Sequence, residues 1–119
     1  MSVPDAGLTE WLNRMCGLST NGTLYVGVGT GTNAEAAADT ALQTELVRVA
    51  LSTKTVSGST MTLKSFFNTA QANGALAETG ILDAAAAGHL LDRSAVAPAQ
   101  TKAATQELIV EYALSLARG

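Results

Sequence analysis

The last part of the chain contains the most regular pattern in the sequence. Between Gln106 and Ala117, large apolar residues recur at every second position, at Leu108, Val110, Tyr112, Leu114 and Leu116. A period of two is typical of a β-strand with one face against a core, whereas a helix would scatter these residues around its surface. No other segment has such a dense alternating row. We therefore expect this strand to lie at the centre of a sheet.

Shorter alternating stretches predict further strands. They lie at residues 24–28, in a segment that starts near Leu46 and reverses at Ser57-Gly58, and at residues 61–67, 76–82 and 89–96. Asn-Gly pairs at Asn21 and Asn73 mark turns between them. Because no crossover helices separate these strands, the sequence predicts an antiparallel β-sandwich of about six strands.

Residues 1–17 are expected to form an N-terminal arm and an amphipathic helix. Asp5 can cap the start of the helix, and Gly17 can end it in a left-handed conformation. One apolar stripe follows the helical spacing, at Leu8, Trp11, Leu12 and Met15. Two interpretations stay open: the helix packs on its own sheet, or it docks on a neighbouring subunit with Trp11 as the anchor. These four residues are therefore candidate interface residues.

Glycine occupies alternate positions at Gly27, Gly29 and Gly31. This spacing lets the backbone bend or approach another chain closely. A dinucleotide-binding loop would need glycine where Thr32 stands, and a phosphate-binding loop would need a lysine followed by serine or threonine. We therefore expect no nucleotide site, and we add the three glycines to the candidate interface.

Length and composition restrict the remaining possibilities. The 119 residues suit a single domain, with the β-sandwich body at residues 18–119, and only 4% of them are aromatic. A net charge of −3 argues against nucleic-acid binding, and no apolar run is long enough to span a membrane. Cys16 is the only cysteine, which excludes an intrachain disulfide and fits assembly in a reducing cytoplasm.

Residues capable of catalysis do not form a known pattern. His89 is the only histidine, and no G-x-S-x-G motif supplies a nucleophile for it. Cys16 falls at the end of the predicted helix, where the dipole disfavours a thiolate, and we expect it to be partly buried. The carboxylates show no metal-binding or acid–base spacing. The sequence therefore predicts a protein that is not an enzyme, with no catalytic residues, cofactor or metal.

Two segments resemble small structural proteins from the virions of tailed bacteriophages. The first begins at Tyr25 and reads YVGVGTGTNAEAAADTALQTELVR, with a Gly-Thr-Gly element before a D-T-A-L segment. The second begins at Asn73 and contains the form E-x-G-[IL]-x-D at Glu78, Gly80 and Asp83. The resemblance implies a β-sandwich that works in multiple copies without catalytic residues. It also implies local roles for the three motif residues, at a strand edge, at a close backbone approach and as a turn cap.

Together these observations predict a non-enzymatic structural component of a tailed-phage virion. It would decorate the head or belong to the neck, tail or fibre apparatus, bind other virion proteins and copies of itself, and assemble in the cytoplasm of the bacterial host. The alternative is a ligand- or carbohydrate-binding β-sandwich module. That alternative would need exposed aromatic side chains on a concave face.

Overall fold

The computed structural model describes residues 3–18 and 23–116. Within these residues one helix, α1 (Asp5–Met15), precedes seven strands. The strands are β1 (Tyr25–Gly29), β2 (Glu45–Ala50), β3 (Thr53–Ser57), β4 (Thr60–Phe67), β5 (Gly74–Leu82), β6 (Leu90–Lys102) and β7 (Leu108–Ser115). The predicted turn at Asn21-Gly22 and the predicted end of the last strand at Ala117 lie outside the described residues.

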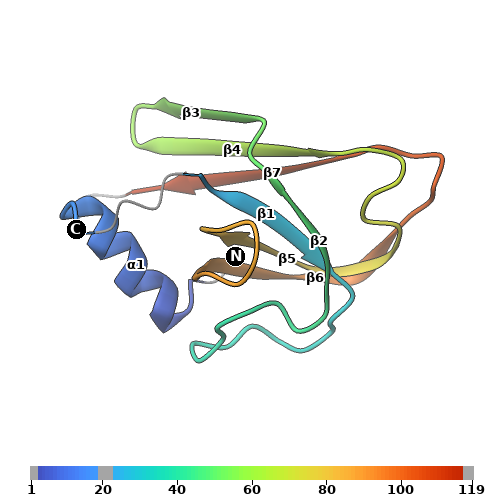
Figure 1. Ribbon diagram of the computed structural model, residues 1–119, viewed down its shortest axis with the longest axis horizontal. Helices are drawn as coiled ribbons and strands as arrows, with labels where there is room; N and C mark the ends of the chain where they lie inside the picture. The colour runs from blue at the N-terminus through green and yellow to red at the C-terminus, as the bar shows by residue number, and fades with distance from the viewer. Residues whose placement is uncertain (1–2, 19–22, 117–119) are drawn as a thin grey trace.

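The strands form two antiparallel sheets that face each other (Figure 1). One sheet has the order β2-β1-β5-β6, and the other has the order β3-β4-β7. The helix lies at one end of the two layers. The predicted class, a mainly β antiparallel sandwich with an N-terminal helix, is confirmed.

The described part of the chain has one strand more than the sequence predicts, because the alternating segment from Leu46 divides between the two sheets. The backbone N–H of Leu51 donates to the carbonyl of Leu24 next to the first sheet. The N–H of Ser52 donates to the carbonyl of Lys64 in the second sheet. The chain therefore changes sheets between these two residues, and β2 and β3 are separate strands. The predicted reversal at Ser57-Gly58 joins β3 to β4, with Gly58 at φ +59°.

The alternating row predicted that the last strand is central, and this prediction is wrong. The strand, β7, forms an edge of the three-stranded sheet. The central strand is β4, which pairs with β3 on one side and with β7 on the other. Tyr112 is the buried member of the alternating row, while Ile109 on the opposite face is 64% exposed. An alternating row of apolar residues shows that one face of a strand packs against a core. An edge strand and a central strand can both have such a face, so the alternation does not show how many strands lie beside it.

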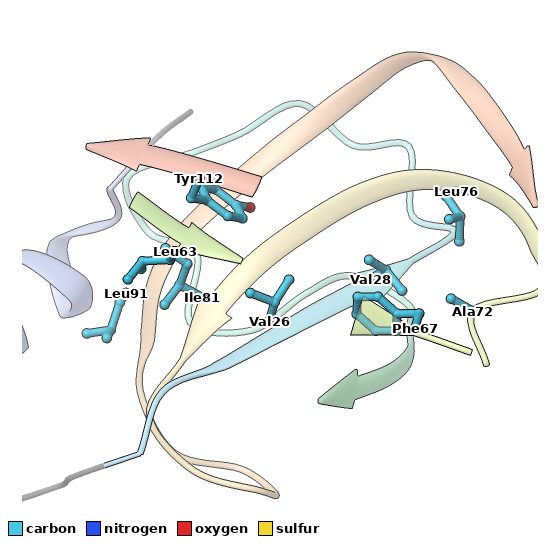
Figure 2. Packing of buried hydrophobic residues seen from close by; sticks show 9 residues of the cluster. All are labelled: Val26, Val28, Leu63, Phe67, Ala72, Leu76, Ile81, Leu91 and Tyr112. Atoms are coloured by element: carbon cyan, nitrogen blue, oxygen red, sulfur yellow. The ribbon is translucent and has the colours of Figure 1, made fainter. Parts of the chain in front are cut away.

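The core fills the space between the sheets, and Figure 2 shows how residues from both layers meet there. The main cluster of buried apolar side chains comprises Val26, Val28, Leu63, Phe67, Ala72, Leu76, Ile81, Leu91 and Tyr112. The hydroxyl group of Tyr112 donates a hydrogen bond across the core to Oγ1 of Thr79, 3.2 Å away. Burial raises the pKa of Tyr112 to about 12. This hydroxyl is therefore a permanent donor that links the two sheets.

Two truncations can test whether β4 is the central strand and β7 an edge strand of the three-stranded sheet. Leu63 is buried in the central strand, so Leu63→Ala should lower the free energy of unfolding by about 2–5 kcal/mol. Leu114 is only half-buried in the edge strand, so Leu114→Ala should cost about 1 kcal/mol. Urea denaturation of both variants gives the comparison. A larger loss for Leu114→Ala would contradict the observed strand order.

Candidate functional site

The helix packs on the chain's own β6 through the side that carries Gly7 and Trp11. A Cβ atom on Gly7 would lie only 2.7 Å from the carbonyl oxygens of Leu90 and Leu91, so the two backbones meet too closely for a side chain. The indole N–H of Trp11 donates to the carbonyl oxygen of Leu91 at 3.3 Å. Of the two interpretations of the helix, packing on its own sheet is confirmed. The Trp11 indole N–H therefore has its partner within the chain.

The other three residues of the predicted helical stripe face solvent. Leu8 is 51% exposed, Leu12 is 61% exposed and Met15 is 73% exposed. They follow one another at helical spacing, so they form a continuous apolar row, which we call the α1 outer face. The helix begins at Asp5 itself, with Pro4 in the capping position, and Gly17 follows its end at φ +74° as predicted.

The three candidate glycines are buried inside the chain. Gly27 of β1 pairs in register with Gly80 of β5, and the side chain of Leu42 covers both. A Cβ atom would lie 3.1 Å from Leu42 Cδ1 at the first glycine and 2.9 Å from Leu42 Cδ2 at the second. The glycine spacing predicted a close approach of another chain, but here the close contacts are made by this chain's own segment 30–44, which we call the covering segment. These glycines offer no surface to a partner.

A buried carboxylate holds the covering segment on the sheet. Glu78 of β5 is fully buried and accepts backbone hydrogen bonds from Gly31 at 2.9 Å, Gln43 at 2.8 Å and Thr44 at 2.7 Å. It also accepts a bond of 3.1 Å from Nε of Arg93. Burial alone would raise the pKa of Glu78, but these donors outweigh it and lower the pKa below 4.5. The resemblance implied a position at a strand edge for Glu78. This prediction is wrong, because Glu78 lies in β5, which is paired with β1 on one side and with β6 on the other.

The Arg93 side chain extends the same network to the far part of the covering segment. Its guanidinium group donates to the carbonyl oxygens of Asn33 and Ala34 and to Oδ2 of Asp39, at 3.1–3.3 Å. Gly80, the middle residue of the E-x-G-[IL]-x-D form, would place a Cβ atom 2.8 Å from the carbonyl oxygen of Asp92. The predicted close backbone approach at this residue is therefore confirmed.

Asp83 is a turn cap, as predicted, and it also belongs to a cluster that the sequence did not reveal. Its Oδ1 accepts a 2.6 Å hydrogen bond from the backbone N–H of His89, and its Oδ2 lies 2.7 Å from Nδ1 of the same histidine. Oε2 of Glu10 approaches Nδ1 to 3.6 Å, and Arg14 Nε lies 3.3 Å from Glu10 Oε1. The fold brings α1 to the turn between β5 and β6, which no motif spacing could show.

The environment of His89 favours its charged form. The hydrogen bond with Asp83 raises the pKa of His89 above 6.5, although partial burial opposes this effect. The negative charges of Asp83 and Glu10 raise the pKa further, and Arg14 lowers it. Cys16 lies just beyond the helix. We expected it to be partly buried, but it is exposed.

One depression formed by the described residues lies beside the end of β6. It has a volume of about 350 Å³ and is lined by Leu76, Gln100, Thr101, Lys102, Gln106, Glu107 and Leu108. None of these side chains is aromatic. The aromatic platform that would favour a carbohydrate-binding module is therefore not found in this depression.

Comparisons with known proteins found no matching family model and no similar curated protein. In the described part of the chain, no helix has the length and apolar character needed to cross a membrane.

The Glu78 network predicts a specific response to acid. The folded-state pKa of Glu78 lies below its ordinary value of 4.5, so its contribution to stability is complete above about pH 4.5 and is lost as the pH falls through the folded-state pKa. Glu78→Gln should lower the free energy of unfolding at pH 7 and flatten its decline below about pH 4.5. Urea denaturation between pH 7 and pH 3 checks this, and parallel curves for the two proteins would contradict it.

Proposed function

We propose that this chain is a non-enzymatic structural component of a tailed-phage virion, which binds copies of itself and other virion proteins. The observation that carries the assembly part of this proposal is the α1 outer face. Leu8, Leu12 and Met15 lie exposed on a helix whose opposite side is fixed to β6. The virion part depends on the sequence resemblance of the segments that begin at Tyr25 and Asn73.

The α1 outer face has the properties of a docking surface. Leu18, which lies just beyond the end of the helix, is also largely exposed. On a soluble monomer, adjacent exposed apolar residues of this kind often mark an interaction site. Because the Trp11 hydrogen bond and the Gly7 contact hold the helix on β6, a partner would meet a preformed surface. Binding to it would require little additional ordering of the chain.

A second surface suited to assembly lies at the β3 edge. Every residue of β3 is exposed, and only one side of this strand is paired with another strand. Val56 lies opposite Met61, on the face of the sheet that carries buried Leu63, yet it is 75% exposed. The four-stranded sheet therefore does not cover β3. An uncovered edge strand is a common template for pairing with another chain.

Sedimentation velocity of the full chain over a range of concentrations tests the assembly proposal. We expect concentration-dependent oligomers for the native chain. The combined variant Leu8→Ser, Leu12→Ser and Met15→Ser should form smaller species than the native chain at the same concentration, because it removes the apolar row without altering the buried side of the helix. Its far-ultraviolet circular dichroism should stay unchanged.

Ile109→Ser is the matched control, because it also replaces an exposed apolar residue but lies on β7, away from α1. It should assemble like the native chain. A native chain that stays monomeric at all concentrations and binds glycans would contradict the proposal. The virion part has its own test: terminase, portal and capsid genes should flank the gene for this chain.

A further inference from the structure

Three side chains with metal-binding groups converge where α1 meets the turn between β5 and β6. Glu10, Asp83 and His89 each offer one ligand atom, and these three atoms lie within 4.8 Å of one another. Nδ1 of His89 lies 2.7 Å from Oδ2 of Asp83 and 3.6 Å from Oε2 of Glu10. We propose that this cluster binds a divalent transition-metal ion of the zinc class, which clamps α1 to the sandwich.

The carboxylates are already oriented for this role. Oδ1 of Asp83 accepts the backbone N–H of His89, and Oε1 of Glu10 forms an ion pair with Nε of Arg14 at 3.3 Å. The second oxygen of each carboxylate is directed at the histidine ring. Outer contacts of this kind fix ligands in known metal sites and tune their affinity. The cluster is therefore a preorganised set of ligands and not a chance meeting of flexible side chains.

The burial of the three side chains favours a site with one open position. The side chains of Asp83 and Glu10 are only 1% and 4% exposed, whereas that of His89 is 52% exposed. An ion can therefore enter from the histidine side, and a water molecule can complete its coordination there. Three protein ligands and one water molecule are the usual set of an open tetrahedral zinc site.

The ligand types and their separations select the metal. An imidazole nitrogen favours zinc and its neighbours, whereas calcium and magnesium take oxygen ligands. Metal–ligand bonds of about 2.0–2.2 Å in a tetrahedron place the ligand atoms roughly 3.3–3.6 Å apart. The present separations of 2.7 and 3.6 Å from Nδ1 are close to this range. All three ligand atoms lie within 4.8 Å of one another, so small movements of the side chains would be needed to accommodate the ion.

This inference does not depend on the proposed virion function, because the cluster lies on the attached side of α1 and not on its outer face.

Calorimetric titration with Zn²⁺ tests the site in the full chain. Cys16→Ser should serve as the reference protein, since it removes the exposed thiol as an alternative zinc ligand. We expect one ion per chain and a rise in melting temperature on binding. In this background, His89→Gln and Glu10→Gln should each weaken binding at least tenfold. Co²⁺ should give the absorption bands of a tetrahedral site, and these bands should disappear in His89→Gln.

Asp5→Asn is the matched control for Glu10→Gln, because it neutralises an exposed carboxylate on the same helix. It should leave the affinity unchanged. Should Glu10→Gln unfold the chain, His89→Gln still decides the question, because its side chain is half-exposed. Absence of zinc binding to the reference protein, or equal binding by reference and His89→Gln, would show that the cluster is an ion pair only and would overturn the proposal.

Discussion

The hydrogen bonds of the buried Glu78 carboxylate hold the covering segment, residues 30–44, on the sandwich. The carboxylate accepts three backbone N–H groups from the two ends of the covering segment and a fourth bond from Arg93. A buried charge is strongly unfavourable unless it is paired and fully hydrogen-bonded, and here it is both. Removing either partner of such a pair typically costs about 3–5 kcal/mol. Glu78 therefore fixes a segment that has no regular secondary structure of its own.

Apolar packing attaches the covering segment to the first sheet at a second place. Gly27 and Gly80 leave a depression in the outer face of the first sheet, and Leu42 from the covering segment fills it. Leu82 and Leu90 pack with Leu42 as a second small cluster. The sheet thus has apolar contacts on both faces, although the chain contains few large aromatic residues.

Much of this architecture could be predicted from the sequence, because alternation and turn residues act locally. The period of two found the strands, and glycine at Gly58 and Gly17 marked a reversal and a helix end. The order of strands could not be predicted, because an edge strand and a central strand have the same period. The cluster of Glu10, Asp83 and His89 was also missed, since it forms only when the helix folds back onto a turn more than 70 residues away.

The proposed function requires that the sandwich present the outer face of α1 to other copies of the chain. Amide hydrogen exchange, measured by mass spectrometry on dilute and concentrated protein, can detect this contact. Exchange should slow in peptides covering α1 (Asp5–Met15) as the chain assembles, while exchange in the central strand β4 (Thr60–Phe67) should stay constant. Assembly that slows exchange elsewhere and leaves α1 unchanged would show that the outer face of α1 is not the interface.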